Sequence, residues 1–146
     1  MIESEPVIVE QTFDAPIAAI WNAITDKDQM RQWFFEDMVD FEPQPGFETE
    51  FSVHCDGRDF VHLWKLTEVI PKQKIVYDWC YRGYPGRSTV VWELSTTPDG
   101  AQLKITHRAE EAFPQDDPVF SRQSCQDGWD WLIRESLKDF LERQTS

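Results

Sequence analysis

The chain of 146 residues has few cysteines, few basic residues and no long apolar run. Its cysteines, Cys55, Cys80 and Cys125, show neither a CxxC motif nor Cys/His metal spacing, so we expect reduced thiols rather than a disulfide scaffold. No stretch approaches the roughly 18 apolar residues that a membrane span requires. The N-terminal run also has early acidic residues and no apolar signal-peptide core, which predicts a cytoplasmic protein.

Basic residues are strongly outnumbered, with 14 Lys and Arg against 27 Asp and Glu and a net charge of −13. Such a chain repels nucleic-acid phosphates and anionic lipids, and no basic cluster offsets the negative field locally. We therefore expect neither nucleic acid nor a membrane surface as a partner. The acidic surface would suit a basic protein partner, although diffuse charge more often serves only solubility.

Aromatic residues, in contrast, are abundant, with seven Trp and ten Phe. A chain of this length can bury one substantial core, and no linker or repeat divides it, so we expect residues 1–146 to form a single domain. Many bulky flat side chains must then fill or line the space inside that domain.

The hydrophobic periodicity predicts an α+β fold. An alternating strand over residues 7–13 precedes a short helix to about residue 25, with Asp14 as its N-cap. Asp26 can cap a second short helix that carries Trp33 and Phe34 on one face, as a gate to an interior chamber or, more simply, as a hydrophobic plug. Five antiparallel strands separated by short turns are predicted next, over 47–55, 59–70, 74–81, 87–96 and 101–109. From about Asp116 onward, a helix of roughly 25 residues closes the chain.

Strand alternation places the bulky side chains on the face that meets the long helix. With tight turns, three layers are expected across the sheet. These layers are Leu66, Tyr77, Leu94 and Leu103; then Trp64, Trp79, Trp92 and Ile105; then His62, Tyr81, Val90 and His107. The polar side chains gather near the loop of residues 82–86, which predicts an apolar chamber with a His/Tyr rim at that end.

Four segments in order resemble one known family. They are FDAPIAAIWNAITDKDQMRQWF (residues 13–34), KLTEVIPKQKIVYDWCY (65–81), STVVWELSTTPDGAQLKITHRAE (88–110) and GWDWLIRESLKDFLE (128–142). Together they are similar to the activator-of-heat-shock-ATPase homologue-like domains over about residues 7–142. The resemblance implies the START-like helix-grip fold of the polyketide cyclase (SRPBCC) superfamily, a curved antiparallel sheet around a long C-terminal helix, typically with a cavity between them.

Two departures from the family pattern concern the cavity. The glycine-containing end of the last strand is replaced by Arg108-Ala109-Glu110, and Trp64 stands where many relatives carry a smaller residue. A smaller or differently shaped chamber is therefore expected. The superfamily contains carriers, receptors, enzymes and chaperone regulators, so the resemblance does not fix one activity.

Three functions stay open from the sequence. The leading one is non-enzymatic binding of a small apolar or aromatic molecule; the others are an interaction module for a heat-shock chaperone ATPase and a cyclase-like enzyme using His62, Tyr81 or His107. No complete catalytic or metal-ligand set is recognised, and no cofactor is predicted. The residues expected to bind the ligand are Trp33, Phe51, His62, Trp64, Tyr77, Trp79, Tyr81, Trp92, His107, Trp129 and Ile133.

Overall fold

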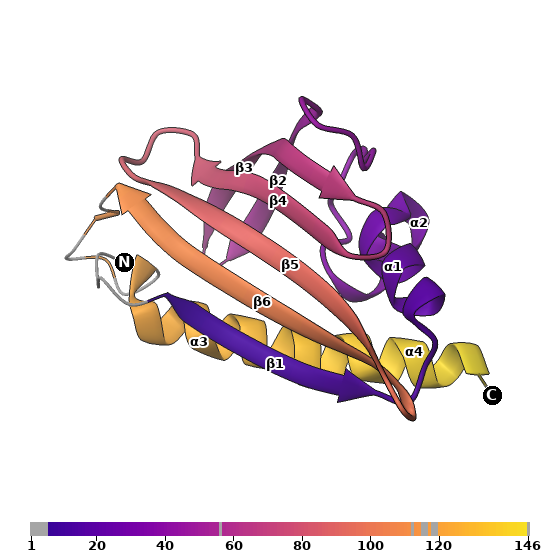
Figure 1. Cartoon of the computed structure of the whole chain (residues 1–146). Coiled ribbons are helices and arrows are strands. Elements are labelled where there is room, and N and C mark those ends of the chain that lie inside the picture. Colours follow the sequence, from indigo (N-terminus) through magenta and orange to yellow (C-terminus); the bar gives the residue numbers. More distant parts are fainter. Residues whose placement is uncertain (1–5, 56, 112, 115–116, 118–119, 146) are drawn as a thin grey trace.

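The fold is a six-stranded antiparallel sheet with two short helices and a long C-terminal helix, as Figure 1 shows. This computed structural model describes residues 6–55, 57–111, 113–114, 117 and 120–145. The elements are β1 (Val7–Phe13), α1 (Ile17–Thr25), α2 (Lys27–Trp33), β2 (Glu48–Cys55), β3 (Arg58–Ile70), β4 (Lys74–Tyr81), β5 (Arg87–Thr97), β6 (Gly100–Glu111), α3 (Arg122–Trp131), η2 (Leu132–Leu137) and α4 (Lys138–Thr145). The α+β class predicted from the sequence is confirmed.

The order of strands in the sheet is β1-β6-β5-β4-β3-β2. Strands β2 to β6 form a meander, and β1 joins its far edge by pairing with β6. The C-terminal helix runs along the sheet, with α3 at one end, while α1 and α2 lie toward the other end, near α4 (Figure 1). The two ends of the sheet therefore meet different partners on their inner face.

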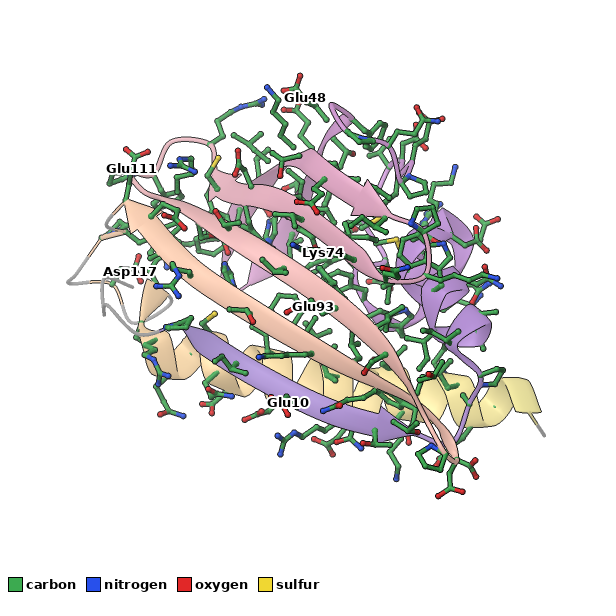
Figure 2. The ribbon with its side chains drawn as sticks, in the orientation of Figure 1. Glu10, Glu48, Lys74, Glu93, Glu111 and Asp117 are labelled. Atoms are coloured by element: carbon green, nitrogen blue, oxygen red, sulfur yellow. The ribbon has the colours of Figure 1, made fainter. Side chains whose placement is uncertain are left out.

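Charged residues of the strands lie on the opposite, outer face. Glu10, Lys74 and Glu93 lie on the face of the sheet turned away from the long helix, as Figure 2 shows. Lys74 is opposite Glu93 in the register of β4 and β5. This alternation of buried and exposed residues is typical of an antiparallel sheet with one face exposed to solvent.

The two short helices begin where local capping chemistry allows. Asp26 caps α2 as predicted, because its side chain accepts a hydrogen bond from the Asp28 backbone N–H at 3.4 Å. The prediction that Asp14 caps α1 is wrong. Helix α1 begins at Ile17 after Pro16, which occupies the cap position in an extended conformation and offers no side-chain oxygen.

Most of the predicted strand pairs are confirmed. Leu94 faces Leu103, Trp92 faces Ile105 and Val90 faces His107 across β5 and β6. Across β3 and β4, the pairs Trp64 with Trp79 and His62 with Tyr81 also occur.

The predicted register between β4 and β5 is wrong by four residues. Tyr77 lies opposite Val90 instead of Leu94, and Trp79 lies opposite Ser88 instead of Trp92. The chain reverses at Gly83, which has a φ of 84°, so the loop closes earlier than the predicted layers need. The three straight layers are therefore replaced by a staggered arrangement.

The C-terminal helix begins later than predicted. Its first residue is Arg122, and the side chain of Ser121 caps it by accepting from the Ser124 backbone N–H at 3.0 Å. The predicted start at Asp116 lies outside the described residues. Between α3 and α4 the helix widens to π-helical geometry in η2, a distortion that is often found at functional sites.

Two further sequence expectations can be compared with the described part of the chain. Cys80 and Cys125 are free thiols, whereas the side chain of Cys55 lies outside the described part. Within the described residues, none of the helices combines the length and the apolar character that crossing a bilayer demands.

Candidate ligand-binding cavity

A cavity of about 290 Å³ lies between the inner face of the sheet and α3. The sheet contributes residues of β2 to β6, and α3 and η2 contribute the opposite wall. The lining residues are Phe35, Val53, Phe60, His62, Trp79, Tyr81, Ser88, His107, Phe113, Phe120, Ser121, Ser124, Cys125, Gly128, Trp129 and Leu132. None of these described residues is Asp, Glu, Lys or Arg, so the wall is apolar with a few uncharged polar groups.

The cavity exists because small side chains face it from the helix and from one strand. Ser121, Ser124, Cys125 and Gly128 lie on α3 or at its cap, and Ser88 lies on β5. A Cβ atom added to Gly128 would have nothing within 4 Å. Large aromatic residues on the opposing strands therefore have no equally large partner on this part of the helix.

Aromatic rings close the end of the cavity beside the β4–β5 loop. Phe113 and Phe120 stack with their centroids 5.7 Å apart, and Tyr81 packs against both rings. Gly86 allows this packing, because a Cβ there would lie 2.7 Å from the Phe113 ring and the backbone has a φ of 112°. The end wall thus depends on a glycine in the loop.

A charged brace holds the same end together from outside. The Arg58 guanidinium donates two hydrogen bonds to the Asp117 carboxylate, at 3.0 and 3.2 Å, and lies 4.8 Å from the Phe60 ring centroid. This contact joins β3 to the segment before α3. Beside it, the rings of Phe60 and Phe120 pack edge to face, with 5.9 Å between their centroids.

His107 is the centre of a hydrogen-bond network on the cavity wall. Its Nδ1 atom lies 2.9 Å from Trp129 Nε1, which can only donate, so Nδ1 is the acceptor and the proton is on Nε2. Nε2 then donates to Ser88 Oγ at 2.7 Å, and Ser88 donates to the Trp79 carbonyl at 2.8 Å. Burial lowers the pKa of His107 to about 3, so the ring is neutral at physiological pH.

The Cys125 thiol also approaches this network, with its Sγ 3.3 Å from His107 Nδ1. A cysteine beside a histidine can act as a nucleophile when the pair forms a thiolate and an imidazolium. Here burial raises the pKa of Cys125 to about 12, and Nδ1 is already occupied by Trp129. The thiol therefore stays protonated beside a neutral imidazole and is not activated.

His62 is the second imidazole on the wall. Its Nδ1 atom lies 3.1 Å from the Phe60 carbonyl oxygen, and its side chain is buried. Burial lowers its pKa to about 4, against the smaller opposing effect of the Phe60 hydrogen bond. Both histidines of the cavity are thus uncharged near neutral pH.

Five of the predicted ligand-binding residues line the cavity: His62, Trp79, Tyr81, His107 and Trp129. The other six, Trp33, Phe51, Trp64, Tyr77, Trp92 and Ile133, are buried outside the cavity lining. The reason is the aromatic end of α2. Phe34 lies between Trp64 and Trp92, with ring centroids 5.6 and 5.7 Å away. It fills this part of the chamber that the sequence predicted.

Trp33 and Phe34 are packed in the way expected of a hydrophobic plug. Trp33 donates its Nε1–H to the Ala23 carbonyl at 2.8 Å, and its own carbonyl accepts from Ser136 of η2 at 2.6 Å. Both side chains are buried, and their rings stack 5.0 Å apart.

Several lining residues were missed from the sequence. Ser88 shares the alternation of Val90 and Trp92, and Cys125 and Leu132 lie at helical spacing from Trp129, so both patterns contained the signal. Phe113 and Phe120 lie in a segment without periodicity, where no such signal exists.

Metal binding finds no support in the described residues, which contain no group of three His, Cys, Asp or Glu placed to hold an ion. His54 and Asp59 contact each other at 2.9 Å with both side chains exposed.

Comparison with known proteins identifies the family. The family described as Activator of Hsp90 ATPase homolog 1-like protein matches residues 14–142. The chain belongs to this family. Its domain is accordingly of the START-like (SRPBCC) class, as the sequence motifs indicated. None of the curated proteins compared with it is similar enough to count as a match.

Solved structures agree on the fold of this family member. Protein CV1439 from Chromobacterium violaceum is 17% identical, with a TM-score of 0.80, over 96% of this chain and 99% of that one. Protein Mll3558 from Rhizobium loti is 22% identical, with a TM-score of 0.80, over 94% of this chain and 96% of that one. Protein MLL2253 from Mesorhizobium loti is 24% identical, with a TM-score of 0.75, over 95% and 98%. At these identities the likeness concerns the fold alone.

Proposed function

We propose that this protein binds a small, uncharged aromatic molecule in the cavity between the sheet and α3, without transforming it. The observation that supports this most is the cavity itself, within a core that is otherwise filled by large aromatic side chains. An unfilled apolar space costs stability, because each lining atom loses packing contacts. A space of this size in so aromatic a core is therefore best explained by a ligand that fills it.

The volume limits the size of the ligand. A dry apolar cavity of about 150 Å³ accommodates benzene, and ligand pockets in proteins generally begin at about 300 Å³. A cavity of about 290 Å³ is close to this lower limit. It suits a molecule with two fused rings rather than a long-chain lipid.

The lining supports an uncharged ligand. A charged group transferred into such a wall would lose its hydration without gaining a counter-ion, because the described lining contains no ionised side chain. Both cavity histidines have lowered pKa values, about 4 for His62 and about 3 for His107, so they are neutral as well.

The test is a binding panel read by tryptophan fluorescence and melting temperature. The panel contains indole, 2-naphthol, 2-naphthoate, flavone and a fatty acid. Trp79 and Trp129 line the cavity, so an occupant should quench their emission, and a ligand that binds only the folded state should raise the melting temperature. The neutral bicyclic compounds are expected to do both, while 2-naphthoate and the fatty acid should do neither.

A matched pair of variants shows whether binding occurs in the cavity. Gly128 borders the cavity at an exposed position, and nothing lies within 4 Å of an added Cβ, so Gly128→Leu should weaken the response by narrowing the space at this border. Gly128→Ala makes the same backbone change with one methyl group and should retain binding. An affinity that is the same in Gly128→Leu as in Gly128→Ala would place the ligand elsewhere.

A flat response across the panel would contradict the proposal. The alternative of a protein partner would then be favoured, since the family description refers to a chaperone ATPase. In that case the purified protein should change the rate of ATP turnover by the chaperone of its own host.

A further inference from the structure

The hydrogen bond of His62 fixes which of its ring nitrogens faces a ligand. A backbone carbonyl can only accept, so the contact between Nδ1 and the Phe60 oxygen at 3.1 Å places the ring proton on Nδ1. Nε2 is then left with a lone pair. Among the described residues, the hydrogen bond of His62 runs through Nδ1 and not through Nε2, and the ring lines the cavity.

Other polar side chains on this wall already make hydrogen bonds, namely His107, Ser88 and Ser121. His107 uses both ring nitrogens, and Ser88 both accepts from His107 and donates to the Trp79 carbonyl. Ser121 Oγ accepts from the Ser124 backbone N–H. The Nε2 lone pair of His62 therefore differs from these acceptors in being available to a ligand.

Packing holds the His62 ring in a fixed orientation. It stacks on Phe51 with the ring centroids 5.1 Å apart. Phe35 and Tyr81 make T-shaped contacts with it, at centroid distances of 5.1 and 4.8 Å. A ring clamped on several sides gives its acceptor a defined direction, and that directionality is what selects among ligands of similar size.

We infer that His62 is a specificity-determining residue, which selects aromatic ligands that carry a hydrogen-bond donor, such as a ring hydroxyl, by accepting that hydrogen bond at Nε2. This inference rests on the proposed function of the cavity and names the ligand class. A neutral hydroxyl suits the site in two ways, since it donates a hydrogen bond to the imidazole lone pair and adds no charge. The ring keeps this role across the neutral range, because its pKa is lowered to about 4.

The experiment compares 2-naphthol with 2-methoxynaphthalene, which has the same rings but no donor. The wild-type protein should bind 2-naphthol about tenfold more tightly, as expected for a buried hydrogen bond of ordinary strength. His62→Phe retains an aromatic ring in the same packing and removes the acceptor, so the two compounds should bind it with affinities that differ by less than about twofold. Val53→Ala alters another part of the cavity wall and should keep the tenfold preference.

A second measurement avoids dependence on the folding of His62→Phe. In the wild-type protein, the ¹⁵N resonance of His62 Nε2 should move much further on saturation with 2-naphthol than with 2-methoxynaphthalene, because only 2-naphthol donates a hydrogen bond to it.

The outcomes separate this inference from the proposed function. Equal binding of the two compounds by the wild-type protein would overturn the selectivity while leaving the cavity as a binding site. A preference retained in His62→Phe would overturn the role of this residue. If neither compound nor any other member of the panel binds, the proposed function fails, and this inference fails with it.

Discussion

The two ends of the sheet's inner face carry the same kinds of side chain, yet one is filled and the other is hollow. We call Trp33, Phe34, Trp64, Tyr77 and Trp92 the packed end; the residues lining the cavity form the hollow end. At the packed end α2 brings its own aromatic residues against those of the strands. At the hollow end α3 contributes one large side chain, Trp129, and otherwise serine, cysteine and glycine.

This contrast shows that aromatic content does not make a pocket. The strands supply aromatic residues at both ends, and the void follows from the side-chain volume of the helix that faces them. The hydrogen bonds differ in the same way. The packed end has a local bond from Trp92 Nε1 to the Tyr77 hydroxyl at 3.0 Å, whereas the hollow end needs the wider His107 network.

The largest expected effect is a loss of stability in mild acid that originates at the hollow end. Burial lowers the pKa values of His62 and His107 to about 4 and about 3, while both are near 6.5 in the unfolded chain. Between pH 6.5 and pH 4 the unfolded chain thus binds more protons than the folded one, and stability falls as the pH falls through this range.

Below pH 6.5 each histidine should contribute about 1.4 kcal/mol per pH unit, giving a total loss of about 4 kcal/mol between pH 7 and pH 5. Urea unfolding at a series of pH values measures this. His62→Phe should reduce the slope by about half, and a stability that is constant from pH 7 to pH 5 would show that the two rings are accessible to protons.

Two leucines of η2 sharpen the comparison on a single helix. Leu137 is fully buried outside the cavity, so Leu137→Ala should reduce the free energy of unfolding by about 3 kcal/mol. Leu132 borders the cavity and is only half-buried, so Leu132→Ala should cost about 1 kcal/mol. Urea denaturation of the two variants provides the test, and equal losses would mean that both positions are packed alike.

A smaller difference is expected between the hydrogen bonds of the two ends. Ser88→Ala leaves both the His107 Nε2–H and the Trp79 carbonyl without this partner, so a loss of about 2 kcal/mol is expected. Tyr77→Phe removes one acceptor, that of the Trp92 indole, and should cost about 1 kcal/mol. Thermal unfolding ranks the two variants, and the reverse order would contradict the network drawn around His107.

The sequence predicted the elements and most strand pairs because both depend on local periodicity and on short turns. Strands β1 and β4 begin and end where the alternation predicted, and Trp64 meets Trp79 as expected. The β4–β5 register was wrong because several loop closures fit the residues between Tyr81 and Arg87, and the backbone geometry of Gly83 decides among them.

The candidate site was predicted only in part. The sequence analysis correctly placed the polar end of the sheet near His62, Tyr81 and His107, since alternation puts all three on the inner face. The boundary between the packed end and the hollow end depends on how Phe34 packs against the sheet. It also depends on how Phe113 and Phe120 pack over the end of the cavity. Those are long-range contacts without a periodic signature.

The central claim, that a ligand enters the hollow end and not the packed end, can be tested by ¹H–¹⁵N spectra of the tryptophan indoles during titration with 2-naphthol. The Trp79 and Trp129 resonances should shift in proportion to occupancy, because both rings line the cavity, while Trp33, which is bonded to Ala23 in the packed end, should stay in place. A shift of Trp33 without one of Trp79 or Trp129, or no shift at all under saturating ligand, would contradict the account.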